Sequence, residues 1–235
     1  MSIYTSVLEN ALLPLGDSFL GHHMMARLRS LRQAQWWAPD QVEEERAARL
    51  KKLLAVAYTE VPFYRSLFGD VPTPTELKNL PVATKAALRA GYPHLTTRNT
   101  GQRCHESCSS GSTGANFCVM EDPETAGRHR ACFLLALEWS GYRLGDPHLQ
   151  IGITPQRGLT KSVKDRFLRC TYLSAFDLSD DALDRGLDHL DRLEIRHVHG
   201  YPGSLYYLAR RALQTGWNRS LVGIVTWGED RKSVV

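Results

Sequence analysis

One run of six small residues carries hydroxyl groups or no side chain at all, and it is the part of the sequence best suited to chemistry. Its two glycines permit tight or left-handed backbone geometry. Such a run can turn several backbone N–H groups inward as an anion-binding nest, and its four hydroxyl groups add donors that suit a polyphosphate. No Gly-Lys-Ser/Thr follows, so the run is not a Walker A loop. A flexible Ser/Gly linker is the alternative interpretation. The six residues are Ser109, Ser110, Gly111, Ser112, Thr113 and Gly114.

The cysteines and nearby histidines are the possible metal ligands. Five cysteines, an odd number, without a secretory signal are typical of reduced thiols, so we expect a cytoplasmic protein with buried thiols. Cys104, His105 and Cys108 have the chemistry of zinc ligands. A structural zinc site usually takes four ligands in two close pairs, however, and the sequence has no second pair. We therefore expect no metal site.

Composition excludes several classes of protein. Of the 235 residues, 43% are hydrophobic, which is enough for a core and argues against disorder. No apolar stretch approaches the length of a membrane span. The net charge of +4 is too small to indicate a nucleic-acid partner. The Arg-rich stretch 22–37, which contains Trp36 and Trp37, could stack on nucleic-acid bases, but a helix with a solvated basic face is favoured.

Hydrophobic periodicity predicts helices that alternate with short apolar strands. The pattern Asp40 to Glu43 resembles a capping box and opens a helix that ends near Glu60 before Pro62. Thr84 is expected to cap a short helix. Further helices are predicted at 123–139, at 179–193 with Ser179 as its cap, and from 202 or 204 to Gly216, and strands at 149–153, 195–199 and 221–226. This alternation favours an α/β fold built on a largely parallel sheet.

The six-residue run resembles the phosphate-binding loop of the adenylate-forming superfamily, which includes acyl-CoA synthetases, luciferase-like ligases and adenylation domains. Five further segments resemble, in the right order, one branch of it: phenylacetate–CoA ligases and CapK-like capsular polysaccharide biosynthesis proteins. The resemblance covers nearly the whole chain, and each motif is short. The five segments are Val61–Arg65, Leu80–Lys85, Leu173–Ser179, His199–Leu205 and Ile224–Glu229.

The resemblance implies an ATP-dependent ligase. In such enzymes the loop holds the β- and γ-phosphates of ATP while a carboxylate attacks the α-phosphorus, and Mg²⁺ shares the phosphate charge. The acyl-adenylate is then passed to a thiol, usually coenzyme A. The implied partner is a small carboxylic acid, with no nucleic acid and no membrane span. His199, Gly200 and Tyr201 are expected near the acyl or nucleotide pocket, although a lone His after an apolar strand is more often structural.

The sequence also departs from the family. Many members have Lys shortly after the loop, whereas Ala115, Asn116 and Phe117 follow here. The Tyr-Gly-x-x-Glu motif that stacks on adenine, the ribose-binding Asp and the C-terminal catalytic Lys do not occur in the chain. The resemblance therefore implies the N-terminal part of the large domain of such a ligase, inactive by itself. Catalytic residues cannot be assigned.

The expected organisation has three parts. Residues 1–100 form an N-terminal helical region, 101–229 form part of an ATP-binding α/β region, and 230–235 resemble the translation of a sequencing adapter. Two other functions stay open. A non-catalytic protein could use the Ser/Gly run only as an anion or nucleotide site, and a nucleic-acid binder could use the Arg and Trp residues of 22–37.

Overall fold

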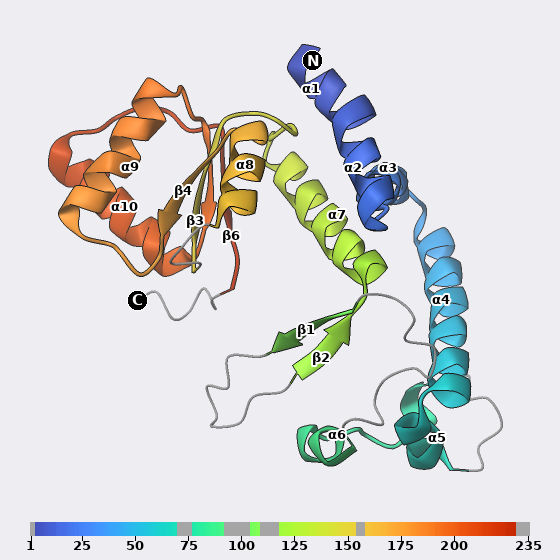
Figure 1. Ribbon diagram of the computed structural model, residues 1–235. Helices are drawn as coiled ribbons and strands as arrows, with labels where there is room; N and C mark the ends of the chain where they lie inside the picture. Colours follow the sequence, from blue (N-terminus) through green and yellow to red (C-terminus); the bar gives the residue numbers. More distant parts are fainter. Residues whose placement is uncertain (1–2, 70–76, 92–103, 109–117, 154–157, 229–235) are drawn as a thin grey trace. The chain divides into compact units, whose positions relative to one another are not determined.

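The structure, a computed structural model, describes residues 3–69, 77–91, 104–108, 118–153 and 158–228 (Figure 1). It confirms the α/β class. Contacts divide the chain into two compact units. The sheet unit comprises Met1–Gly16 with Cys132–Val235, and the hairpin unit comprises Asp17–Ala131. This division does not test the boundaries expected at residues 100 and 229, which stay predictions.

Within the described ranges, no helix is both long and apolar enough to cross a membrane.

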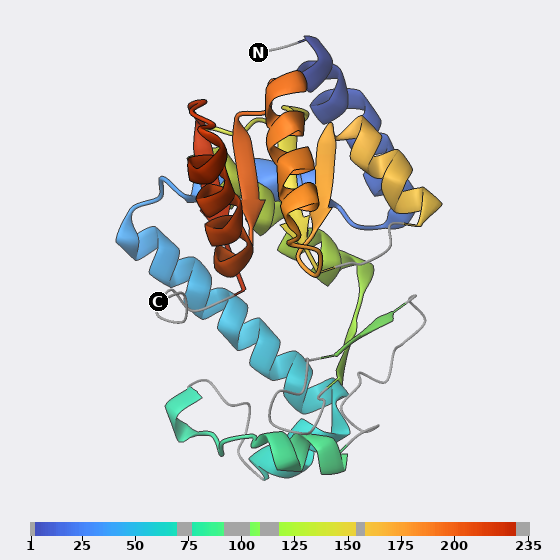
Figure 2. The same cartoon turned by 90° about the vertical axis from the view of Figure 1, so that its left-hand side faces the viewer.

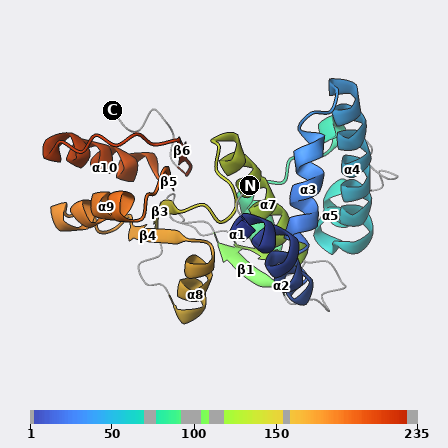
Figure 3. The same ribbon diagram turned by 90° about the horizontal axis from the view of Figure 1, so that it is seen from above.

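The sheet unit is built on four parallel strands. They are β3 (His148–Gly152), β4 (Cys170–Ser174), β5 (His197–Gly200) and β6 (Gly223–Thr226). Their order is β4-β3-β5-β6, which can be followed from one edge of the sheet to the other in Figure 3. In the register, Ile151 of β3 lies beside Leu173 of β4 and beside Gly200 of β5. The chain therefore leaves β3 towards one side and returns to its other side.

Two amphipathic helices cover one face of this sheet (Figure 2). They are α9 (Asp180–Arg192) and α10 (Pro202–Thr215). The side chain of Ser179 caps α9, as predicted, by accepting a hydrogen bond from the backbone N–H of Ala182, and Gly216 ends α10 at φ 72°. Burial of the apolar faces of these helices against the sheet stabilises the unit. The core consists of Leu149, Ile151, Leu183, Leu187, Leu190, Ile195, Val198, Leu208 and Ala212.

Side chains alternate along a strand, so the neighbours of the core residues point to the opposite face. That face carries the three histidines of β3 and β5: His148, His197 and His199. Tyr142 and Phe133 lie against them. Phe133 belongs to α7 (Pro123–Trp139), whose bounds match the predicted helix. This face of the sheet is therefore aromatic and polar, whereas the other is aliphatic.

No individual bounds were predicted for the other helices of the sheet unit, three of which lie in the region 1–100 that was expected to be helical. They are α1 (Ile3–Val7), the π-helical η1 (Leu8–Leu12), the first part of α2 (Leu13–Leu20) and α8 (Leu159–Phe167). Tyr4 joins α1 to the end of α8, because its hydroxyl donates a hydrogen bond to the carbonyl of Phe167 and Arg169 lies over its ring, 4.2 Å from the centroid. Strand β4 was missed as well.

The hairpin unit contains helices and one antiparallel pair of strands. The helices are α3 (Met24–Ala34), α4 (Pro39–Glu60), α5 (Pro62–Phe68), the 3₁₀ turn η2 (Leu77–Asn79) and α6 (Lys85–Gly91). The strands are β1 (His105–Cys108) and β2 (Cys118–Glu121). Thr84 caps α6 as predicted, by accepting a hydrogen bond from the N–H of Ala87. Asp17 accepts one from the N–H of Met25 at the start of α3.

Two predictions about local structure were wrong. The N-cap of α4 is Ala38, and the side chain of Gln41 accepts the hydrogen bond of its N–H. Asp40 therefore lies inside the first turn, because Pro39 takes the first helical position.

The cysteines are neither all reduced nor buried. Cys108 and Cys118 form a disulfide. Of the three cysteines outside it, Cys132 is exposed, and Cys104 and Cys170 are partly exposed.

Candidate functional site

The predicted phosphate loop lies outside the described residues, and only its flanks can be placed. Residues Ser109–Gly114 fall within the undescribed span 109–117. The strand before it, β1, and the strand after it, β2, pair antiparallel in the hairpin unit. Cys108 and Cys118 lie opposite each other at the two ends of the span, with their Cα atoms 4.0 Å apart. The loop therefore stays a prediction, but the segments on either side of it form a hairpin.

The other predicted site residues lie at the carboxyl ends of the parallel strands. His199 and Gly200 end β5, and Tyr201 precedes α10. The N–H of Trp227, just after β6, donates a hydrogen bond to the carbonyl of Gly200. In open parallel sheets, ligands bind at the carboxyl ends of the strands, at the point where the strand order reverses. Here the order reverses at β3, so Gly152 and Gly200 end the two strands that flank this point.

Gly200 is required by close packing between strands. A Cβ atom at this position would lie 2.8 Å from the carbonyl oxygen of Ile151 and 2.9 Å from its Cβ atom. Real Cβ contacts are longer than this, so a larger residue would push β5 away from β3. Gly228 is similar, since its Cβ atom would lie 2.4 Å from the ring of Tyr201. The turns after β5 and β6 are thus packed directly against each other.

His199 lies inside a cage of aromatic rings. Its ring is stacked on that of His148 at a centroid distance of 5.1 Å, and it lies 4.8 Å from Trp227 and 5.7 Å from Phe133. Only 3% of the residue is exposed. Neither ring nitrogen of His199 has a hydrogen-bond partner among the described residues. A buried polar group without a partner destabilises the fold, which makes this position unusual for a purely structural residue.

Burial determines the charge of these histidines. Burial, and to a lesser extent the neighbouring His148, lowers the pKa of His199 to about 3. The pKa values of His148 and His197 are also lowered, mainly by burial. All three rings are therefore neutral in the folded protein near pH 7. His199 can exchange a hydrogen bond with a ligand there, but it cannot supply a positive charge.

Three members of the cage, His148, Trp227 and Phe133, were not predicted as site residues. The alternation of His197, Val198 and His199 along one strand was a visible signal that histidines gather on one face of the sheet, because it places two of them on the same side. Nothing in the sequence indicated that Phe133, from a helix more than sixty residues earlier, would lie against them. Strands β1 and β2 belong to the hairpin unit, and the aromatic cage belongs to the sheet unit.

A search with protein-family models gives no match, and a search of curated proteins also gives none. Solved structures of 2-hydroxyisobutyryl-CoA ligase do match in fold. The complex with 2-HIB-AMP and CoA in the thioesterification state has a TM-score of 0.56 at 20% identity, covering 80% of this chain and 43% of that chain. An open conformation with the same two ligands has a TM-score of 0.55 at 20% identity, covering 80% and 44%. The postadenylation complex with R3-HIB-AMP has a TM-score of 0.54 at 21% identity, covering 80% of this chain and 43% of that chain.

At this identity the likeness shows the fold alone. This chain spans less than half the length of those ligases, which are adenylate-forming enzymes. Four-fifths of the chain thus shares its α/β fold with one part of an adenylate-forming CoA ligase.

Proposed function

We propose that this chain is the N-terminal part of an ATP-dependent ligase that activates a carboxylic acid. A carboxylate oxygen attacks the α-phosphorus of ATP, the bond from that phosphorus to the bridging oxygen breaks, and pyrophosphate leaves. The acyl group then passes from AMP to coenzyme A. The observation that carries the proposal is the fold shared with CoA ligases, found in a chain that also has the Ser/Gly run between two paired strands.

Each predicted site residue has a role in this proposal. Ser109–Gly114 would hold the β- and γ-phosphates through backbone N–H groups and hydroxyls, with Mg²⁺ sharing the charge. His199, Gly200 and Tyr201 would border the acyl or nucleotide pocket at the carboxyl end of β5. Because His199 is neutral, we assign it a hydrogen-bonding role and not that of a charged catalyst. The enzyme would belong to the phenylacetate–CoA ligase and CapK-like branch and act in the cytoplasm on a small acid.

Nucleotide binding tests the role of the loop. Gly111→Val should weaken ATP binding about tenfold or more in a calorimetric titration, because a β-branched side chain opposes the backbone geometry that a nest needs. Ser107→Ala is the matched control. Ser107 is exposed in β1, two residues before the loop, and its loss should leave ATP binding unchanged. Equal binding by the wild type and Gly111→Val would overturn the assignment of the loop.

Exchange of radioactive pyrophosphate into ATP tests the activity itself. With a panel of aryl and aliphatic acids, the 235-residue chain should give no exchange, because it has no Tyr-Gly-x-x-Glu motif and no catalytic Lys after it. The same chain extended by the rest of a related ligase should restore exchange with at least one acid. ATP binding without exchange in the extended protein would instead support a non-catalytic nucleotide-binding protein.

A further inference from the structure

The β1–β2 hairpin has two chemically different faces. The register pairs His105 with Glu121, Glu106 with Met120, and Cys108 with Cys118. Since side chains alternate along each strand, one face carries Glu106, Cys108, Cys118 and Met120. The other carries Glu121, whose carboxylate lies 2.8 Å from Nδ1 of His129 in α7 and 3.8 Å from Nδ1 of His105. The carboxylate of Glu121 is therefore engaged by histidines, and the sulfur atoms are gathered on the opposite face.

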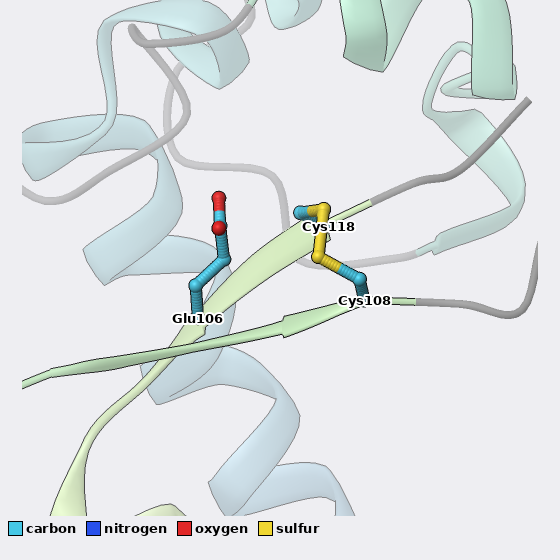
Figure 4. A group of neighbouring side chains, drawn as sticks. All are labelled: Glu106, Cys108 and Cys118. Carbon is cyan, nitrogen blue, oxygen red and sulfur yellow. A yellow bond between two sulfur atoms is a disulfide. The ribbon is translucent and has the colours of Figure 1, made fainter.

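The first face brings three metal-binding side chains together. A carboxylate oxygen of Glu106 and the Sγ atoms of Cys108 and Cys118 all lie within 4.8 Å of one another. Figure 4 shows the carboxylate and the disulfide on the same side of the hairpin. Among the described residues, no other group of three such side chains is this close. The set differs from the one that the sequence suggested, since neither Cys104 nor His105 belongs to it.

We propose that Glu106, Cys108 and Cys118 form a zinc site when the disulfide is reduced. Zn²⁺ prefers thiolate ligands, accepts carboxylate oxygen, and is commonly four-coordinate. With Zn–S bonds of ~2.3 Å, two thiolates on one tetrahedral ion lie about 3.8 Å apart, so the two Sγ atoms must separate to this distance once the disulfide is reduced. Three protein ligands leave one position for water, and the exposed Glu106 and Cys108 make the site accessible from solvent.

The disulfide is then the metal-free, oxidised form of the same site. In a balanced step, one cysteine thiolate attacks a small disulfide such as oxidised glutathione and releases one glutathione thiolate. The second cysteine thiolate attacks the mixed disulfide and releases the other. The protein loses two electrons, the incoming disulfide gains them, and Zn²⁺ leaves because its two sulfur ligands are now bonded to each other. Metal and disulfide are alternative links between the ends of the span 109–117, so oxidation would exchange one link for the other.

A titration with Co²⁺, a spectroscopic substitute for Zn²⁺, tests the site in the full chain. The protein is reduced with dithiothreitol, freed of the reductant without air, and titrated. One equivalent should bind and give a thiolate-to-cobalt charge-transfer band in the near ultraviolet, and Zn²⁺ should abolish the band by displacement. Cys108→Ser or Cys118→Ser should weaken binding by about tenfold or more, and Glu106→Gln should weaken it while the band remains. Protein oxidised with glutathione disulfide should bind no Co²⁺ through sulfur.

The exposed Cys132, on helix α7, provides the matched control. Cys132→Ser should bind Co²⁺ with wild-type affinity and spectrum. Counting thiols under denaturing conditions defines the two states: five in the reduced chain and three in the oxidised chain. The proposal is overturned if reduced wild type gives no charge-transfer band, or if both Cys108→Ser and Cys118→Ser, shown by circular dichroism to be folded, bind as the wild type does.

Discussion

Replacing His199 with phenylalanine should remove a large part of the protein's sensitivity to acid. The pKa of His199 is lowered from 6.5 to about 3 by burial among aromatic rings. Above pH 6.5 the ring is neutral in both the folded and the unfolded chain, so it contributes no dependence on pH. Below that, the unfolded chain binds a proton that the folded chain excludes. The free energy of unfolding therefore falls as the pH falls from 6.5 towards 3.

The expected change in the free energy of unfolding follows from the lowered pKa of His199. Between about pH 7 and about pH 4.5, this one histidine should lower the free energy of unfolding by roughly 2–3 kcal/mol. His199→Phe should lose that part of the decline. It should also be no less stable than wild type near neutral pH, because both ring nitrogens of His199 lack partners among the described residues and a phenyl ring needs none. Urea unfolding followed by circular dichroism at several pH values measures both effects.

Phe133→Leu is the control for packing. Phe133 touches the His199 ring but does not titrate, so its replacement should lower stability by a similar amount at every pH. His148 and His197 also have lowered pKa values, so some acid sensitivity should persist in His199→Phe. If the wild type and His199→Phe lose stability in parallel as the pH falls, His199 is not buried as the structure places it.

Gly200→Val should lower the free energy of unfolding by about 3 kcal/mol, the upper end of the usual cost of overpacking. The first added carbon would already lie within 3 Å of Ile151 in the neighbouring strand, and this contact involves backbone that cannot turn aside. This close contact can be relieved only if β5 separates from β3. Because Tyr201 follows Gly200 directly, we also expect a changed environment for Tyr201 and Trp227, which near-ultraviolet circular dichroism would detect.

Gly16→Ala is the matched control because it adds bulk where there is space. Nothing lies within 4 Å of a Cβ atom at Gly16, which is inside helix α2. In a helix, alanine is favoured over glycine, so this variant should gain about 0.5–1 kcal/mol. Stability changes of opposite sign in Gly200→Val and Gly16→Ala would show that the loss at Gly200 comes from close packing and not from a general intolerance of added methyl groups. A Gly200→Val protein as stable as wild type would show that β3 and β5 do not approach each other as described.

Local signals in the sequence predicted much of the secondary structure. Pro123 and Gly141 bracketed helix α7, and Ser179 predicted the cap of α9, because these residue types stabilise helix ends whatever surrounds them. Periodicity at helical spacing predicted the buried faces of α9 and α10, which are the elements with the clearest apolar stripes. Strand β4 was missed, because its five residues are all half-buried and include Cys170, Thr171 and Ser174, so no alternation marks them.

The order of the strands and the surroundings of His199 were decided by the tertiary structure. The sequence determined the α/β class and the positions of the glycines, because backbone preferences and hydrophobic periodicity act over a few residues. It could not determine that β3 lies between β4 and β5, that Gly200 meets Ile151, or that Phe133 and Trp227 enclose His199. The pairing of Cys108 with Cys118 likewise depends on the register of β1 with β2. Each of these contacts joins residues distant in sequence, and it forms only when the whole core packs in one arrangement.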